Sequence, residues 1–136
     1  MKSDLRKKVA SFGRELSPDM IRGTNQLFAE ISNGLSPGTQ VTRDIAYGPD
    51  PRHRLDIFRK DEAEDACVLL FVHGGGFVMG DKHTEGSPFY TNVGDMAARY
   101  GMIGVTMTYR LAPAHQFPSG VEDMALAIGW LRENIA

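Results

Sequence analysis

A continuous apolar run from Cys67 to Val72, CVLLFV, leads directly into a histidine and three consecutive glycines, Gly74 to Gly76. Unbroken apolar runs of this length are typical of strands that are covered on both faces, as in parallel sheets. A helix is predicted next, beginning at Ser87-Pro88 and ending at Gly101, and MIGVTMTY follows as a second buried strand. Two such strands joined by a crossover helix are expected to be parallel, with a right-handed connection. The sequence therefore predicts an α/β fold built around this unit.

The elements on either side follow from changes in the period of the apolar residues. TQVTRDIAY and HRLDIFRK alternate apolar and polar residues around the turn-forming GPDPR, which predicts a hairpin with one buried face. FPSGVEDMALAIGWLREN carries apolar residues at helical spacing. With two helices at the N-terminus, the predicted order is helix, helix, strand, strand, strand, helix, strand, helix.

The two N-terminal helices are predicted from spacing and capping residues. Apolar residues recur at helical spacing within residues 2–14, and a second helix starts with Ser17-Pro18 as cap and first position and stops near Gly34. Its apolar stripe is typical of a helix packed on a core, and a cap over a substrate cleft is the alternative. We expect residues 1–38 to form this N-terminal part and residues 39–136 to form the core.

Composition is that of an ordinary globular domain, with 42% hydrophobic and 24% charged residues among 136. The net charge of -2 gives no reason to expect a nucleic-acid partner. We interpret the basic cluster Arg6-Lys7-Lys8 as part of a solvated helix face. No signal peptide is recognisable and no run approaches the roughly 20 apolar residues of a membrane span, so a cytoplasmic location and no membrane contact are expected. The single cysteine, Cys67, is expected to be a buried, inert thiol.

Glycines between a strand and a helix can serve several kinds of site. A dinucleotide site needs Gly-X-Gly-X-X-Gly, but Met79 stands at the third position, and the strand MIGVTMTYR lacks the acidic residue that binds a ribose. The Gly-Lys-Ser/Thr of a P-loop is absent. A metal site would need His73, His83 and His115, whose spacing matches no ligand pattern. We therefore expect neither a cofactor nor a metal.

An oxyanion hole is the use that fits these glycines. Acyl transfer develops a negative charge on a carbonyl oxygen, and backbone N–H groups aimed at that oxygen stabilise it. Glycines permit backbone conformations closed to other residues and let a substrate approach the main chain. His-Gly-Gly-Gly after a core strand is the form that this device takes in esterases and lipases. Here the motif reads His73-Gly74-Gly75-Gly76-Phe77.

A second stretch, TYRLAPAHQFPSGVEDMALAIGWL from Thr108 to Leu131, closely resembles the hormone-sensitive-lipase-like branch of the α/β hydrolases. The HRLDIF hairpin and the paired N-terminal helices fit the same family. The resemblance spans the chain from Thr39 onwards and is weaker before it. It implies the N-terminal half of an α/β-hydrolase fold, in which an antiparallel hairpin leads into a parallel sheet with flanking helices, preceded by cap-like helices.

The resemblance also implies roles for the motif residues. Gly75 and Gly76 would supply backbone N–H groups to the oxyanion, and Gly74 would shape the turn. His73 would brace the loop by hydrogen bonding and would not act as the catalytic base. The substrate that the resemblance implies is a small ester.

Further residues receive binding or structural roles from the same resemblance. The acyl side of the substrate pocket would be lined by Phe77, Val78 and Met79, with core packing as the alternative. Arg110 and Asp123 would form an ion pair that fixes their loop to the last helix. His53 and His83 have no assigned role and are expected at the surface.

The serine nucleophile of the family is missing from the sequence. In the family it occupies Gly-X-Ser-X-Gly on a sharp turn after the next strand, and no serine here lies in that context. Ser87 is better explained as a helix cap and Ser119 as a loop residue. The chain is therefore expected to be the N-terminal portion of a serine carboxylic-ester hydrolase, active only with a C-terminal part that carries Ser, Asp or Glu, and His.

The open edge of the CVLLFV strand bears on the partners of the chain. In the family, the strand that carries the nucleophile lies beside this one, and an uncovered apolar edge is an aggregation hazard. The expected cover is the C-terminal remainder of the same hydrolase as a separate chain, or a second copy of this chain in a homo-oligomer.

The alternatives for the function of the chain are an amide or formamide hydrolase, a non-catalytic binding or assembly module, and a nucleotide-binding domain.

Overall fold

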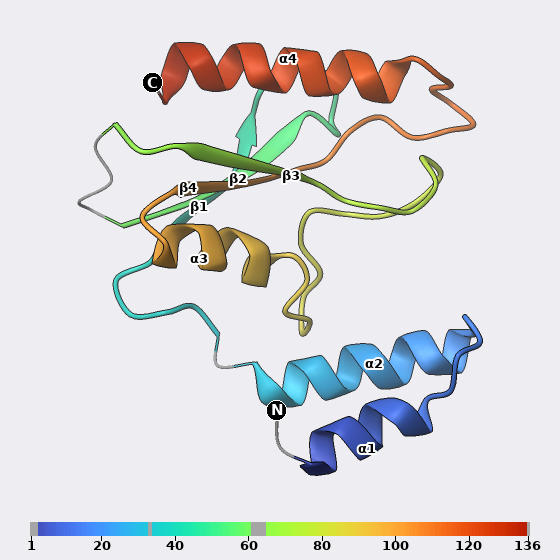
Figure 1. The fold of residues 1–136 in the computed structure, drawn as a ribbon. Helices are drawn as coiled ribbons and strands as arrows, with labels where there is room; N and C mark the ends of the chain where they lie inside the picture. The colour runs from blue at the N-terminus through green and yellow to red at the C-terminus, as the bar shows by residue number, and fades with distance from the viewer. Residues whose placement is uncertain (1–2, 33, 61–64, 136) are drawn as a thin grey trace.

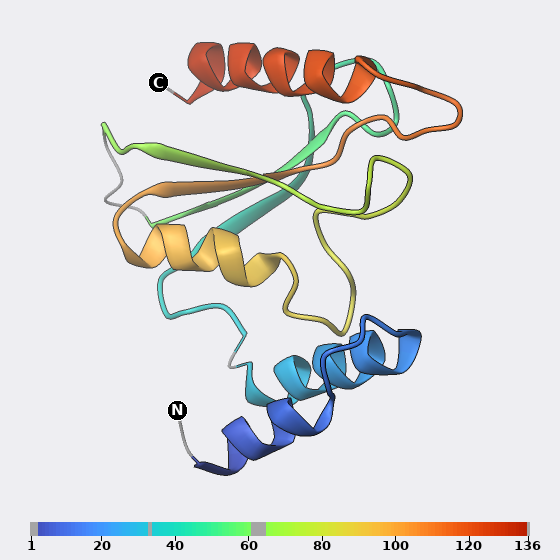
Figure 2. The same ribbon diagram turned by 45° about the vertical axis from the view of Figure 1, so that its right-hand side comes forward.

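The computed structural model describes residues 3–32, 34–60 and 65–135. In this part of the chain, a four-stranded sheet lies between helix α4 on one face and helix α3 on the other (Figure 1). Helices α1 and α2 lie next to each other beyond α3 in both views (Figure 2). The helices are α1 (Ser3–Ser11), α2 (Pro18–Ile31), α3 (Thr91–Arg99) and α4 (Ser119–Asn134). The α/β class and the predicted order of elements are confirmed.

The sheet joins an antiparallel hairpin to a parallel pair of strands. Its strands are β1 (Gln40–Ala46), β2 (Arg54–Arg59), β3 (Val68–Val72) and β4 (Ile103–Met107). They lie in the order β1-β2-β4-β3, with β1–β2 and β2–β4 antiparallel and β3–β4 parallel. The predicted hairpin and the predicted parallel crossover through α3 are both confirmed.

The core lies on both faces of β4, whose five residues are all buried. On one face, Val105 and Met107 pack with Leu55 of β2 and with Ala127 of α4. On the other face, α3 approaches β4 so closely that a Cβ atom added to Gly104 would lie 2.4 Å from the carbonyl oxygen of Gly94. A Cβ atom added to Gly94 would lie 2.1 Å from the ring of Phe58 in β2, so glycine is needed at both positions to bring α3 onto the sheet.

Three serines are predicted as helix caps or as a loop residue, and the structure differs from the prediction at Ser87 and Ser119. Ser17 caps α2 as predicted, with its hydroxyl oxygen accepting from the Met20 N–H at 3.2 Å. Ser87 does not cap α3, because the chain makes a further turn, in which the Ser87 hydroxyl accepts from the Phe89 N–H at 3.3 Å, and the helix begins only at Thr91. Ser119 is the first residue of α4 and is buried, so its prediction as a loop residue is wrong.

The burial of β3 is lower than its apolar sequence predicted. Val68 is 41% exposed and the rest of the strand is half-buried. Cys67, expected to be buried, is exposed. The physical reason is position, since among the described residues β3 pairs only with β4 and ends the sheet. Its outer edge is unpaired within this part of the chain.

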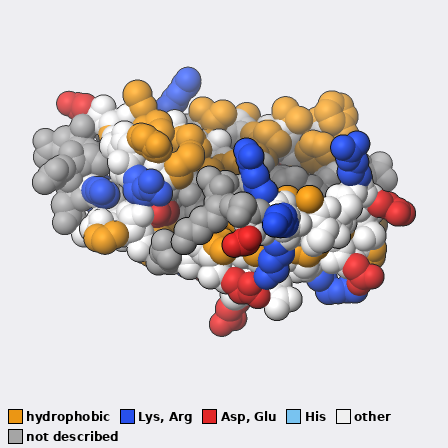
Figure 3. Space-filling model, turned by 60° about the horizontal axis from the view of Figure 1, so that its bottom comes forward, with side chains coloured by type: hydrophobic (Ala, Val, Ile, Leu, Met, Phe, Trp, Pro, Cys, Tyr) orange, Lys and Arg blue, Asp and Glu red, His pale blue; other side chains and the backbone are white. Residues whose placement is uncertain are grey.

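Helix α2 is held near α3 by contacts of the segment that follows it and of its own apolar face. Asp95 of α3 accepts from the Ser36 N–H at 2.9 Å and from the Ser36 hydroxyl at 2.7 Å, which ties the segment after α2 to α3. Leu27 is buried, and Phe28 packs on Phe89 at a ring distance of 5.5 Å. Seen from the side on which α1 and α2 lie, the surface carries most of its hydrophobic side chains along one edge, and charged side chains are spread over the rest (Figure 3). No helix among the described residues has the length and apolar character that crossing a membrane requires.

His53 and the predicted pair of Arg110 and Asp123 form one buried cluster. The Arg110 Nη2 atom lies 2.6 Å from Asp123 Oδ1, and the Arg110 backbone N–H donates to Oδ2 at 2.8 Å, so the predicted ion pair is confirmed. His53, expected at the surface, is buried because its ring fills the space between Tyr47 and α4, with Nε2 3.0 Å from Asp123 Oδ1. The cluster fixes the segment after β4 to α4.

Acid should weaken this cluster. Burial alone would raise the pKa of Asp123, but hydrogen bonds from Arg110 and the contact with His53 lower it below the ordinary 3.8. A carboxyl with a lowered folded-state pKa stabilises the fold above the unfolded-state pKa and loses that contribution as pH falls. We expect the free energy of unfolding, measured in urea from pH 7 to 2.5, to fall more steeply below pH ~4 in the wild type than in Asp123→Asn. Equal slopes would contradict this account.

A second buried cluster anchors the chain beyond the glycines. Lys82 is 6% exposed at its side chain, and its Nζ lies 2.8 Å from Asp56 and 2.7 Å from Asp44. Asp56 is fully buried and also pairs with Arg43 at 2.6 Å. A buried carboxylate is stable only with its charged partners in place. The ion pairs of Lys82 with Asp44 and Asp56 therefore link the chain just after the glycine loop to β1 and β2.

Replacing Lys82 should therefore destabilise the protein strongly. We expect Lys82→Met to lower the free energy of unfolding by about 3 kcal/mol, since it removes one cation from a buried carboxylate. The matched control is Lys8→Met, because Lys8 pairs with Glu30 at 3.1 Å with both side chains about half exposed. Such an exposed pair contributes less than about 1 kcal/mol. Urea unfolding of both variants tests this, and equal losses would contradict it.

Candidate active site

The glycine loop lies at the carboxyl ends of the two parallel strands. Residues 73–80 follow β3, and residues 108–118 follow β4, so both segments leave the sheet on the same side, at the right of Figure 1. Crevices outside the carboxyl ends of parallel strands are the usual place for ligand sites in α/β sheets. The fold therefore puts the glycines where a substrate site is expected.

The backbone of the loop requires glycine at specific positions. Gly75 and Gly76 have φ angles of +128° and +63°. A Cβ atom on Gly75 would lie 2.0 Å from the Met79 carbonyl oxygen, so no other residue fits there. Phe77 also adopts a left-handed φ of +63°, and its carbonyl oxygen accepts from the Ala112 N–H at 2.8 Å. The loop is thus a tight turn fastened to the segment after β4.

Two peptide N–H groups of the loop are free to bind a ligand. The Gly75 carbonyl accepts from the N–H groups of Val78 and Met79, each at 3.2 Å, and the Gly74 carbonyl lies 2.8 Å from His73 Nδ1. In a trans peptide the N–H points opposite to the carbonyl. The N–H groups of Gly75 and Gly76 therefore point away from these contacts. Within the described part of the chain neither makes a hydrogen bond, and both residues are exposed.

His73 is buried and oriented by three contacts. Its ring stacks on Tyr109 at 4.4 Å, and its Nε2 lies 3.3 Å from the Arg52 Nη2 atom. Because a guanidinium can only donate, Nε2 accepts, and the ring hydrogen is on Nδ1, from where it donates to the Gly74 carbonyl. Burial lowers the pKa of His73, and the Arg52 charge lowers it further. His73 is thus a neutral ring with both nitrogens engaged.

Sequence reasoning missed three residues that shape the loop. Arg52 donates from Nη2 to the Gly80 carbonyl at 2.9 Å, and the Tyr109 hydroxyl donates to the His73 carbonyl at 3.0 Å. Gly80 has a φ of +115°, and a Cβ atom there would lie 2.3 Å from His73 Nδ1. Tyr109 lies inside the second motif, so its position was a usable signal. Arg52 contacts the loop only through the tertiary fold, and the close approach of Gly80 to His73 depends on how the loop closes on itself.

The residues predicted to line the acyl pocket are largely exposed. Val78 and Met79 are 60% and 64% exposed, so neither packs in the core. Phe77 is 53% exposed, lies 5.7 Å from the Tyr109 ring and borders a small cavity of about 90 Å³ beside Gly120. All three belong to the glycine loop, and their contact with a substrate stays a prediction.

A larger cavity of about 380 Å³ adjoins the glycines. The loop contributes Gly74 and Gly80, and α2 contributes Ile21 and Asn25 from the other side. Helix α2 therefore borders a cavity that opens onto the glycine loop, and its role as a cap stays a prediction.

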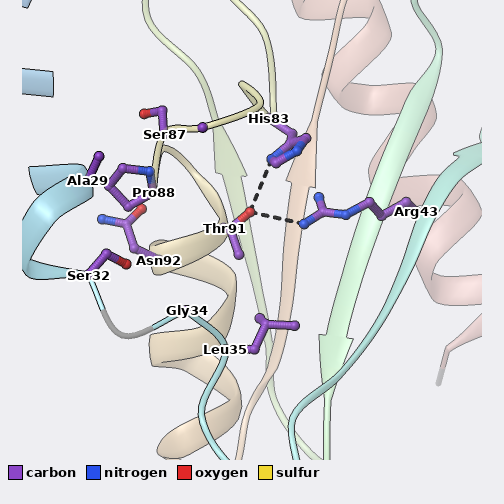
Figure 4. Close-up of a pocket in the computed structure, with 11 residues that line it drawn as sticks. Ala29, Ser32, Gly34, Leu35, Arg43, His83, Ser87, Pro88, Thr91 and Asn92 are labelled. Atoms are coloured by element: carbon purple, nitrogen blue, oxygen red, sulfur yellow. Dashed lines mark hydrogen bonds between the residues drawn. The ribbon is translucent and has the colours of Figure 1, made fainter. Parts of the chain in front are cut away.

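A neighbouring cavity of about 340 Å³ lies between α2 and the start of α3 (Figure 4). Arg43 donates to the Thr91 hydroxyl at 3.1 Å, and the same hydroxyl lies 3.2 Å from His83 Nδ1. His83, expected at the surface, is half-buried by these contacts. None of the loop glycines from Gly74 to Gly80 borders this cavity, so it is separate from the glycine loop. The described residues contain no cluster of acidic, histidine or cysteine side chains suited to a metal ion.

The sequence pattern that defines the alpha/beta hydrolase fold family matches residues 69–136, half of the chain. The chain belongs to the α/β hydrolase fold family. Among its relatives, the esterase LipC of Mycobacterium tuberculosis is 36% identical over 95 residues, which is 68% of this chain and 23% of that protein. The probable carboxylesterase 8 of Arabidopsis thaliana is 32% identical over 71% of this chain and 30% of that protein.

Solved structures of α/β hydrolases extend the similarity over nearly the whole chain. An esterase of the bacterial hormone-sensitive lipase family superposes with a TM-score of 0.66 and 25% identity, covering 99% of this chain and 44% of that one. The chain thus spans less than half the length of these α/β hydrolases. A further relative, the bile salt-activated lipase of Homo sapiens, is 31% identical over 71% of this chain and 15% of that protein. These relatives establish the esterase- and lipase-like character of the family.

The loop geometry predicts that Gly80 cannot carry a side chain. We expect Gly80→Ala to lower the free energy of unfolding by about 3 kcal/mol, because its methyl group would wedge between His73 and the Gly74 carbonyl. Gly86→Ala is the matched control, since Gly86 also has a positive φ but open space at its Cβ. The control should lose about 1 kcal/mol, the cost of the left-handed backbone alone. Equal losses in urea unfolding would contradict the clash.

Proposed function

We propose that this chain supplies the oxyanion hole of a serine carboxylic-ester hydrolase. The observation that carries the proposal is the pair of exposed N–H groups of Gly75 and Gly76, whose peptide carbonyls are engaged inside the loop. Preorganised donors of this kind stabilise charge without reorganising during the reaction. The esterases and carboxylesterases among the relatives support the choice of an ester as substrate.

The reaction divides between this chain and a part outside it. A serine of the missing part would attack the ester carbonyl carbon after a histidine takes its proton, and the carbonyl oxygen would become an oxyanion. Gly75 and Gly76 would donate to that oxygen in the two tetrahedral intermediates, before and after the acyl-enzyme. Loss of one such donor typically lowers kcat about 10²- to 10³-fold. Without the serine, the 136-residue chain should give negligible turnover.

The missing part would also complete the sheet. The unpaired outer edge of β3 and the exposed Val68 provide a place for a further strand. We propose that the C-terminal remainder of the same hydrolase occupies it as a separate chain, with a second copy of this chain as the competing occupant. A small ester would lie against Gly74, with Phe77, Val78 and Met79 on its acyl side.

The experiment begins with the intact mass of the purified protein under denaturing conditions. If a second polypeptide accompanies the 136-residue chain, we expect hydrolysis of p-nitrophenyl butyrate and labelling of a serine on that second polypeptide by an alkyl phosphonate. If only this chain is found, we expect no hydrolysis. Hydrolysis by the isolated chain would contradict the division of the active site.

A chimera tests the oxyanion role itself. Residues 39–136 replace the matching segment of the related hormone-sensitive-lipase-family esterase, so that the relative supplies the serine and histidine. We expect the folded chimera to hydrolyse p-nitrophenyl butyrate. The Gly75→Ala version should lose activity about 10²-fold or more, because its methyl group would clash with the Met79 carbonyl oxygen and displace the N–H donors of the loop. A folded chimera that binds the phosphonate but stays equally active with Gly75→Ala would overturn the role.

A further inference from the structure

We propose that Arg52 is a positioning residue that aims the Gly75 N–H at the oxyanion by way of His73. This inference rests on the proposed function, since it assigns a cause to the orientation of an oxyanion donor. Arg52 lies in the turn between β1 and β2, outside both motifs that the sequence resemblance uses. Its role follows from contacts that only the folded chain brings together.

One guanidinium joins three points around the loop. Nε donates to the Tyr109 carbonyl at 2.8 Å, and Nη2 donates to the Gly80 carbonyl at 2.9 Å and lies 3.3 Å from His73 Nε2. The Tyr109 carbonyl belongs to the segment after β4, the Gly80 carbonyl to the end of the loop, and His73 to its beginning. The two ends of the loop therefore meet on a single planar group, whose donors point in fixed directions.

The contact with His73 selects the tautomer of the ring. Since Arg52 cannot accept, it holds Nε2 as the acceptor and leaves the hydrogen on Nδ1. Nδ1 then donates to the Gly74 carbonyl at 2.8 Å. In the other tautomer, Nδ1 would face that carbonyl oxygen with a lone pair, and the two acceptors would repel each other. The direction of the Gly74 carbonyl thus depends on Arg52.

Peptide planarity carries this orientation to the oxyanion donor. The carbonyl of Gly74 and the N–H of Gly75 belong to one rigid peptide group and point in opposite directions. Fixing the carbonyl on the His73 side fixes the N–H on the exposed side. Gly75 has no side chain that could hold the peptide otherwise, so a rotation of this group would redirect the donor at little steric cost.

The side chain of Arg52 can be changed without removing the supports of its backbone. The Arg52 N–H donates to Asp50 Oδ1 at 2.8 Å, and the Thr108 hydroxyl donates to the Arg52 carbonyl at 2.5 Å. The side chain itself is 29% exposed. A lysine at this position offers one ammonium group and cannot reproduce the fork that contacts three acceptors. Arg52→Lys therefore keeps the charge and loses the geometry.

The first experiment reads the His73 tautomer directly in the 136-residue chain, without any need for catalysis. We expect long-range ¹H–¹⁵N spectra at pH 7 to show the Nδ1–H form in the wild type and a mixture of forms in Arg52→Ala and Arg52→Lys, with a shifted Gly75 amide. Arg54→Ala is the matched control, because Arg54 lies in the same hairpin and donates to the His53 carbonyl at 2.9 Å. An unchanged tautomer and Gly75 amide in folded Arg52→Lys would overturn the proposal.

The second experiment measures catalysis in the hydrolase formed with its C-terminal part. Both Arg52 variants should lower kcat for p-nitrophenyl butyrate about 10- to 100-fold and leave KM unchanged. This decrease is no larger than the decrease expected when a whole oxyanion donor is lost. Binding of a trifluoromethyl ketone, which mimics the tetrahedral intermediate, should weaken by the same factor. A change in KM alone would overturn the proposal. Absence of activity in the wild type would instead overturn the proposed function, while the tautomer still decides the role of Arg52.

Discussion

The stack of His73 on Tyr109 is the contact on which the site depends. The two residues follow the two parallel strands, so the stack joins both segments that leave the sheet at its carboxyl edge. The Tyr109 hydroxyl strengthens the junction by donating to the His73 carbonyl. Because both rings are buried, the first residue of the glycine loop is fixed like a core residue, while the glycines that follow are exposed. Rigid support beneath exposed donors is what charge stabilisation requires.

Charged groups fix the surroundings of the loop where apolar packing does not reach. Lys82, which follows the loop, pairs with the buried carboxylate of Asp56. Arg110, in the segment after β4, pairs with the buried carboxylate of Asp123. Each buried carboxylate has more than one partner, which offsets the desolvation that burial imposes. The loop is therefore held at its beginning by rings, at its end by a buried cation, and across both ends by Arg52.

Much of the fold could be predicted because its signals are local. The apolar run of β4 and the alternation in β1 and β2 specify strands, and the cap at Ser17 specifies the start of α2. The failures have a common cause, since burial is a property of neighbours. Cys67 lies in an apolar run but next to an unpaired sheet edge, whereas His53 is polar but fills a space between Tyr47 and α4.

The sequence by itself determined the order of the elements, the parallel pair of strands and the place of the glycines after β3. These follow from periodicity and from the backbone freedom of glycine, which are properties of single segments. Only the tertiary structure decided which groups orient the loop. Arg52, Tyr109 and Gly80 are separated along the chain, and each contacts His73 or its peptide after the hairpin and β4 have packed together. Hydrogen bonds have short range and strict direction, so their partners are specified by the folded arrangement and not by the spacing of residues along the chain.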